Sequence, residues 1–263
     1  MEKRFLPPNE IAQAICDASA ARVKLAVSQL LMLGIFAGAF IGFGSQAAIT
    51  IGQSLGRIDL GLQRFAFGAA FPIGLMLVVV CGAELFTGNN LMTLGFMNSR
   101  FKWSDIIKNW IVVYSANFAG AVLTALVVAN AGLMAAGTPV SDYALGIAEK
   151  KLAIGLGPAI LRGILCNILV VLAVWMATGA RDIIGKLFAC WFPIMTFVMC
   201  GYEHSIANMY FIPLGKFLGA PVTWGQIWMN NLMPVTIGNI IGGALIVPLV
   251  YHVAYMRSSN TSG

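Results

Sequence analysis

Two carboxylates lie at matching places within long apolar stretches of this chain. The pattern Gly-x-Glu-x4-Asn occurs at residues 82–89 and again at residues 201–208, around Glu84 and Glu203. A carboxylate inside a membrane span is costly and is usually functional, so a repeated one indicates a polar path between two related halves. This chemistry is typical of a transporter or a channel.

Basic side chains accompany the second carboxylate. His204 follows Glu203 directly and is one of two histidines in the chain. Within a membrane an imidazole can donate to an anion or pass it a proton near neutral pH, and the alternative is a hydrogen-bonded core histidine. Lys150 and Lys151 precede the fourth apolar run, either as solvated loop lysines or with one folded inward toward Glu203. These side chains favour a small anion as the ligand.

The composition places these groups in an integral membrane domain. Of 263 residues, 59% are hydrophobic and 10% are charged, whereas soluble domains carry about 25% charged residues. Six uncharged runs are long enough for membrane helices of about 20 residues. These runs are 25–56, 65–83, 109–141, 163–180, 187–202 and 217–256. The net charge of +6 follows mainly from topology, and no clustered soluble basic face indicates nucleic-acid binding.

Six spans place both termini on one side of the membrane. More of the Lys and Arg residues fall on that side, which predicts both termini in the cytoplasm and a multi-pass protein of the bacterial cytoplasmic membrane. Residues 1–24 lack the features of a cleaved signal peptide and are interpreted as a cytoplasmic amphipathic segment. The five cysteines have no CxxC spacing and are expected to pack rather than bind a metal. No cofactor is expected, because no phosphate-binding loop occurs.

Two of the spans are expected to be broken. Between Phe65 and Ser99 the only charged residue is Glu84, yet one helix of that length would exceed the hydrocarbon thickness of about 30 Å. Gly and Asn favour turns, so we predict the first break at residues 85–90, with Thr87 capping the half-helix that follows. The corresponding break is predicted at residues 201–205. Broken helices at matching positions mark the binding site in inverted-repeat transporters.

A second repeated pattern supports an internal duplication. Asn-x7-Asn-x2-Gly occurs at residues 109–120 and at residues 231–242. Three spans in each half make the halves inverted in the membrane. We therefore predict one all-α transmembrane domain over residues 1–263, with a first repeat at 25–136 and a second at 151–256.

The motifs resemble those of the formate/nitrite transporter family over essentially the whole chain. Gly-Ala-Glu-Leu-Phe-Thr-Gly-Asn-Asn at 82–90 resembles the signature of the broken second span, and Glu203-His204-Ser205-x2-Asn208 resembles its counterpart on the fifth. Lys151 and Asn167 also match the family pattern. Within the family, the overall sequence resembles most the clostridial hydrosulfide channels. Gly-Asn-Asn at 88–90 departs from the Ser-Thr-Val type of segment in formate channels, which speaks against formate as the principal substrate.

The resemblance implies an aquaporin-like fold of six helices, with helices 2 and 5 broken, in a homopentamer with one pore per protomer. It implies that Thr87 and His204 face a central chamber, with a polar network around the histidine. The residues expected at the pore and its network are Thr87, His204, Lys151, Asn167, Glu203, Asn89 and Asn208. The resemblance also implies a cytoplasmic constriction of Phe71, Leu75 and Phe197, and an outer constriction of Leu85, Phe86 and Val170.

The function predicted from these features is a channel for small monovalent anions of weak acids. Hydrosulfide is the principal expected ion, with formate and nitrite also permeating, as the anion or as the neutral acid. The alternative is a formate or nitrite channel, or a proton-coupled transporter of these ions. A membrane enzyme using Glu84, Glu203 and His204 is a remote alternative, since no HExxH or GxSxG motif occurs. A passive structural subunit would leave the repeated polar breaks unexplained.

Overall fold

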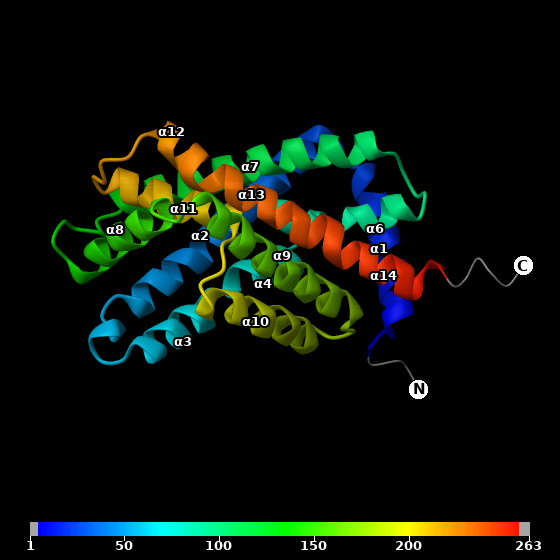
Figure 1. Ribbon diagram of the computed structural model, residues 1–263, viewed down its shortest axis with the longest axis horizontal. Helices are drawn as coiled ribbons and strands as arrows, with labels where there is room; N and C mark the ends of the chain where they lie inside the picture. The colour runs from blue at the N-terminus through cyan, green and yellow to red at the C-terminus, as the bar shows by residue number, and fades with distance from the viewer. Residues whose placement is uncertain (1–4, 258–263) are drawn as a thin grey trace, which may run out of the picture.

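The chain folds into a bundle of helices in the computed structural model, which describes residues 5–257 (Figure 1). Residues 1–4 of the expected N-terminal segment lie outside this range. The elements in chain order are α1 (Pro8–Val23), α2 (Val27–Gly52), η1 (Leu55–Arg57), α3 (Leu60–Ala70), α4 (Ile73–Cys81), α5 (Phe86–Asn89), α6 (Met92–Met97), α7 (Trp103–Asn130), α8 (Pro139–Leu152), α9 (Leu156–Gly179), α10 (Ile183–Met199), α11 (Ser205–Phe217), α12 (Trp224–Ile227), η2 (Trp228–Leu232), α13 (Met233–Ile240), η3 (Ile241–Ile246) and α14 (Val247–Tyr255).

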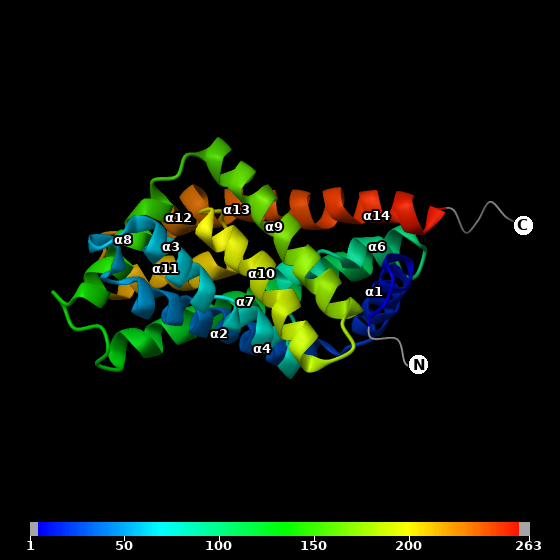
Figure 2. The same cartoon turned by 90° about the horizontal axis from the view of Figure 1, so that it is seen from below.

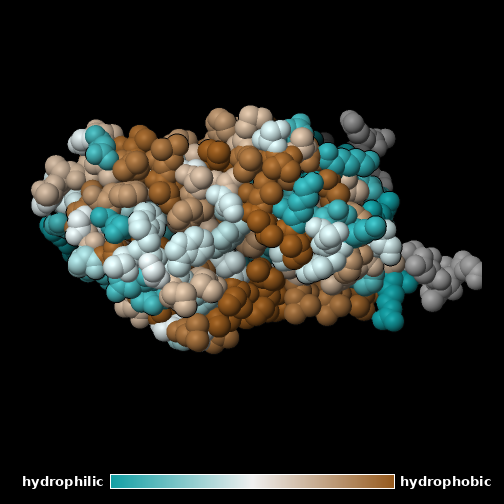
Figure 3. Space-filling view, turned by 90° about the horizontal axis from the view of Figure 1, so that it is seen from above, coloured by the Kyte–Doolittle hydropathy of each residue, from teal (hydrophilic) through white to brown (hydrophobic). Residues whose placement is uncertain are grey.

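The bundle has two distinct ends, and the long helices run between them (Figures 1 and 2). α1 lies at one end, together with both ends of the described chain, whereas α8 lies at the other. On the face drawn in Figure 3, large hydrophobic patches lie between the ends among paler residues, and hydrophilic residues gather toward the two ends. This is the surface expected of a membrane protein. We refer to the two ends as the α1 side and the α8 side.

The spans agree with the six predicted from the sequence. Among residues 5–257, five helices are long and apolar enough to cross a membrane. These are 27–57, 60–81, 103–130, 156–179 and 224–255. The remaining span begins with α10, which has only 17 residues. It stops at a break, beyond which α11 continues to the α8 side (Figure 1).

The predicted break in the second half is confirmed. α10 ends at Met199, and the chain has no helical structure again until Ser205 begins α11. Gly201 adopts a left-handed conformation with φ of 73°, which a residue with a side chain rarely takes. The glycine therefore allows the chain to leave α10 abruptly and re-enter the bundle as a loop.

The first break lies earlier than predicted. α4 ends at Cys81, Gly82 takes φ of 77°, and α5 already begins at Phe86. The prediction of a break at residues 85–90 was therefore wrong in position. Thr87 also lies inside α5 and not at its cap; the N-cap is Leu85, without a side-chain cap bond. Gly82 is thus the residue that ends α4. In the Gly-Asn-Asn stretch that suggested a turn, Asn89 lies in α5 and Asn90 follows it, and both amide side chains are buried.

Glycines allow the spans of each half to pack closely. A Cβ on Gly38 in α2 would collide with the carbonyl oxygen of Asn117 in α7. In the second half, a Cβ on Gly163 in α9 would lie 2.7 Å from the carbonyl oxygen of Val235 in α13. Small residues at such crossings let backbones approach in membrane helices. The glycines at these crossings thus serve close helix packing.

α1 is packed against the bundle by its apolar face. Ile11, Ala12, Ile15 and Cys16 are buried, and the helix lies against α6, α9 and α14. Burial raises the pKa of the Cys16 thiol to about 11. The N-terminal amphipathic segment is therefore, from Pro8 onward, a structured part of the α1 side.

Candidate functional site

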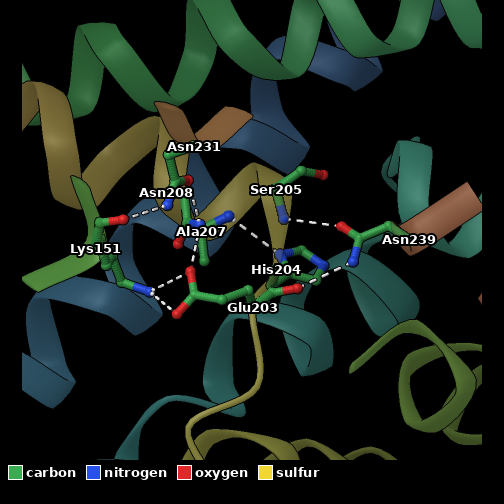
Figure 4. A network of polar contacts seen from close by, with 8 residues as sticks. All are labelled: Lys151, Glu203, His204, Ser205, Ala207, Asn208, Asn231 and Asn239. Atoms are coloured by element: carbon green, nitrogen blue, oxygen red, sulfur yellow. Dashed lines mark hydrogen bonds and ion pairs between the residues drawn. The ribbon is translucent and has the colours of Figure 1, made fainter. Parts of the chain in front are cut away.

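The second break places Glu203 in a buried polar network (Figure 4). Lys151 at the end of α8 donates from Nζ to both carboxylate oxygens of Glu203, each at 3.0 Å. Asn208 on α11 donates from Nδ2 to Glu203 Oε2 at 2.6 Å. Glu203 is only 4% exposed. A buried charge is tolerated only with such partners. Of the two alternatives left open by the sequence, Lys151 is therefore the lysine folded inward, and it holds the carboxylate.

Further amides connect this network to the backbone of α8. Asn208 Nδ2 also donates to Asn231 Oδ1 at 2.7 Å, and Asn231 Nδ2 donates to the carbonyl oxygen of Lys151 at 2.8 Å. Asn231 is fully buried, near the start of the last span. Lys151 is thus fixed through both its side chain and its backbone.

Asn239 fixes the loop that carries the histidine (Figure 4). Its Nδ2 donates to the carbonyl oxygens of Glu203 and Gly163, at 3.0 Å and 2.8 Å. Its Oδ1 accepts from the backbone N–H of Ser205 at 2.9 Å. The start of α11 has backbone N–H groups without helical partners. One amide side chain therefore satisfies one of these donors and two carbonyl groups of the spans.

The first half repeats the carboxylate site. Glu84 accepts from Arg22 Nε at 2.8 Å and from Asn89 Nδ2 at 2.6 Å. Asn89 Nδ2 also donates to Asn109 Oδ1 at 2.9 Å. Arg22, on the last turn of α1, thus takes the role for Glu84 that Lys151 on the last turn of α8 has for Glu203. The sequence analysis did not select Arg22, because it lies before the first apolar run.

The loop anchor is repeated as well. Asn117 Nδ2 donates to the carbonyl oxygens of Gly34 and Glu84, at 2.8 Å and 2.9 Å. Its Oδ1 accepts from the backbone N–H of Phe86 at 2.9 Å. These are the bonds that Asn239 makes in the second half. The repeated Asn-x7-Asn-x2-Gly pattern therefore marks the anchors of the two broken spans, a role that the sequence analysis did not assign.

Thr87 and His204 meet between the two breaks. Thr87 Oγ1 lies 2.9 Å from His204 Nε2, and both residues are buried. The backbone N–H of Ala207 donates to His204 Nδ1 at 3.1 Å. An N–H can only donate, so in the neutral ring the proton is on Nε2 and is given to Thr87. The Thr87 hydroxyl then keeps its own hydrogen for a bound anion.

Asn167 joins the first loop to the last span. Its Nδ2 donates to Asn90 Oδ1 at 2.8 Å, to the carbonyl oxygen of Asn239 at 2.7 Å and to that of Thr87 at 3.3 Å. Asn167 is fully buried in α9. It therefore lies beside the Thr87 and His204 pair, as the resemblance implied. Asn90 is a further member of the site that the sequence analysis did not select.

Cavities lie on both sides of this pair. One, of about 80 Å³, is lined by Phe71, Phe197, Lys151, His204 and Asn208, among others. The Phe71 and Phe197 rings meet edge to face with centroids 5.8 Å apart, and the His204 ring stacks on Phe197 at 5.8 Å.

A larger cavity, of about 260 Å³, opens beside α1. It is lined by Leu75, Leu85, Arg22, Glu84 and Asn89, among others. Its walls include α1, α4 and the loop of the first break, whereas those of the smaller pocket include α8, α11 and the loop of the second break.

The cavities divide the apolar residues differently from the constrictions that the resemblance implied, which stay a prediction. Leu75 belongs with Leu85 on the α1 side, and not with Phe71 and Phe197 on the α8 side. The reason is geometric, since Leu75 lies one turn further along the second span toward the break. The Phe86 ring packs edge to face against Trp110 and Tyr114, and Val170 is buried on α9.

Known proteins are similar to this chain in sequence and in fold. The family model described as formate/nitrite transporter matches residues 9–253. The "Probable formate transporter" of Methanothermobacter thermautotrophicus is 40% identical, with 98% of this chain and all of that protein aligned. A solved "FNT family ion channel" is 28% identical, with a TM-score of 0.86 over 93% of this chain and 98% of that one.

A second solved structure, a "Pentameric formate channel with formate bound", is 30% identical. Its TM-score is 0.77, covering 87% of this chain and 97% of that one. These relatives are channels and transporters rather than enzymes. The family model covers nearly the whole chain, and it includes both broken spans and every residue of the paired carboxylate sites. The chain belongs to the formate/nitrite transporter family.

Proposed function

We propose that this protein is a channel that passes small monovalent anions of weak acids across a membrane. The observation that carries the proposal is the Thr87 and His204 pair, held at 2.9 Å between a cavity on the α8 side and one on the α1 side. The hydroxyl and imidazole are donors between two cavities whose walls include large apolar side chains. Such groups recognise an anion where solvent is scarce.

The apolar walls set the form in which the solute crosses. Phe71 and Phe197 line the α8-side pocket, and Leu75 and Leu85 line the α1-side cavity. Moving a bare charge past such walls costs several kcal/mol or more. The solute therefore crosses either as a partly desolvated anion or, after taking a proton near His204, as the neutral acid. The second route explains the apolar walls better.

Formate is the substrate that the names of the relatives support. Hydrosulfide and nitrite are small, monovalent and conjugate to weak acids, so we expect them to permeate as well. Hydrosulfide as the principal ion rests on the subgroup resemblance alone and stays a prediction. By analogy with the solved pentameric channel, we propose a homopentamer with one pore in each protomer. We also propose a location in the bacterial cytoplasmic membrane with both termini in the cytoplasm.

Stopped-flow flux in proteoliposomes tests the proposal. Formate, hydrosulfide, nitrite and chloride would be compared for the wild type, for Thr87→Val and for the control Thr124→Val. Thr87→Val keeps the shape of the side chain but removes the hydroxyl, so formate flux should fall at least about tenfold, the effect of about 1.4 kcal/mol. Thr124 is buried on α7 and lines neither cavity, and its hydroxyl bonds only its own helix, at the carbonyl oxygen of Gly120, so its variant should match the wild type.

The outcomes separate the alternatives. Formate flux far above chloride supports the channel, and hydrosulfide flux above formate would make hydrosulfide the principal ion. No flux of any of these anions from correctly folded protein would overturn the proposal.

A further inference from the structure

A second cavity on the α8 side opens next to the narrow pocket. This cavity, which we call the α8-side vestibule, has a volume of about 450 Å³. Its lining includes Lys151 and Glu203, which also line the 80 Å³ pocket that contains His204. The vestibule is thus continuous with the proposed pore at the paired charges.

Three further cations from separate elements face the α8-side vestibule. They are Arg64 of α3, Lys150 of α8 and Arg162 of α9. All three are exposed, and none takes part in the ion pairs found within residues 5–257. Lys151 is committed to Glu203, so this pair contributes little net charge. Glu203 is the one carboxylate among the lining residues and is bound by Lys151, so the three cations face the cavity without an ion-pair partner.

The cavity on the α1 side differs in charge. Its charged lining residues are Arg22, Lys186 and Glu84, and Arg22 is paired with Glu84 at 2.8 Å. Lys186 is the one charged residue of that lining outside the Arg22 and Glu84 ion pair. The α8-side vestibule and the α1-side cavity therefore both adjoin a copy of the repeated carboxylate site, but they differ in the number of unpaired cations in their walls.

We propose that the α8-side vestibule is an anion-collecting site, in which Arg64, Lys150 and Arg162 hold small oxyanions before they reach the narrow pocket. A concave wall of one sign focuses the field and raises the local concentration of counter-ions by about 10-fold to 1000-fold. This deepens the proposed function and rests on it for its role in transport. The binding itself depends only on the charges.

The vestibule should hold dianions more tightly than monovalent ions. A dianion gains more from three cations, yet it loses more when stripped of water in an apolar passage. Sulfate should therefore occupy the α8-side vestibule without crossing, and compete there with the permeating anion.

The modification rate of Cys200 by charged thiol reagents measures the electrostatic potential in the α8-side vestibule. Cys200 is exposed and lines the α8-side vestibule, whereas Cys16, Cys166 and Cys190 are buried. In a Cys81→Ser background, Cys200 is the exposed thiol that remains. The experiment compares its rates of modification by anionic sulfonatoethyl and cationic trimethylammonioethyl methanethiosulfonate, followed by mass spectrometry on the purified protein at low salt.

The quantity compared is the rate of the anionic reagent divided by that of the cationic reagent. We expect this ratio at Cys200 to exceed the ratio of their intrinsic reactivities at least about tenfold. Arg64→Gln, Lys150→Gln and Arg162→Gln combined should remove this preference. Arg57→Gln, which changes an exposed arginine of η1 that does not line the cavity, should keep it. Sodium sulfate should slow the anionic reagent more than sodium chloride of equal ionic strength does.

A preference that survives the triple substitution, or sulfate and chloride acting alike, would overturn the proposal. Failure of both reagents to reach Cys200 would also overturn it, because the vestibule would then not be open. None of these readouts requires transport. A protein that moves no formate but keeps the charge preference would refute the channel function and retain the anion site.

Discussion

Each half of the protein uses one carboxylate to fix a basic residue from the helix that precedes its first span. The two pairs differ in burial. In the second half, the side chains of Lys151 and Glu203 are 17% and 5% exposed. In the first half, those of Arg22 and Glu84 are 31% and 8% exposed. Removing one partner of a buried pair leaves an uncompensated charge, and the penalty grows with burial.

Glu203→Gln should therefore destabilise the protein more than Glu84→Gln. The first change leaves the Lys151 ammonium buried without its carboxylate, at a cost of about 3–5 kcal/mol. Arg22 can turn toward solvent after the second change, which should cost less. Thermal unfolding of the detergent-solubilised variants measures the difference. Lys151→Met combined with Glu203→Gln should recover part of the loss. Equal losses from both single changes would contradict this account.

Much of the residue-level site could be predicted from sequence, because its members lie in motifs within apolar surroundings. Glu203, His204 and Asn208 were found through the repeated pattern, and Lys151 through the family pattern. Arg22 was not found, because it lies in a polar N-terminal segment with several other charged residues. A charged residue is conspicuous only among apolar neighbours. The side of the pore on which Leu75 lies was also not predictable, because it depends on where the second span breaks.

At the scale of elements, the breaks are set by glycine and by anchoring amides. Gly82 and Gly201 end α4 and α10 in left-handed conformations, while Asn117 and Asn239 hold the loops that follow. The sequence predicted two breaks correctly, but it misplaced the first. The Gly-Asn-Asn run of residues 88–90 has the composition of a turn, and the tertiary hydrogen bonds of its amides with Asn109 and Asn167 override that preference.

α1 is an element of fixed structure in this fold, and Cys16 can test its docking. Burial raises the pKa of this thiol from 9.0 to about 11, so at pH 8 its reactive thiolate is about 100-fold scarcer than for an ordinary thiol. We expect a maleimide to label exposed Cys81 long before Cys16. Ile15→Asp, which places a charge in the buried face of α1, should bring the two rates together. Rapid labelling of Cys16 in the wild type would show that α1 leaves the bundle.

At the scale of the whole molecule, the two halves place different chemistry at equivalent points. Leu85 and His204 are the N-cap residues of α5 and α11, with φ and ψ of −109° and 121° against −110° and 116°. Each is followed by a residue whose N–H is held by the asparagine anchor of its own half. Thr87 and Ile206 are likewise equivalent. The duplication therefore built a symmetric scaffold, and the polar pair across its centre makes the pore asymmetric.

If this scaffold is symmetric in function, the polar pair should work when it is exchanged between the halves. We predict that a fourfold variant restores the flux lost in His204→Leu; its changes are Leu85→His, Thr87→Ile, His204→Leu and Ile206→Thr. Its formate flux should be at least about tenfold above that of His204→Leu alone, which corresponds to a barrier lowered by about 1.4 kcal/mol. The new imidazole would start α5 as His204 starts α11, with the backbone N–H of Gly88 placed to donate to its Nδ1. The measurement is stopped-flow flux at matched thermal stability. A folded exchange variant with no more flux than His204→Leu would mean that the surrounding charges, rather than the symmetric scaffold, fix the histidine to the second half.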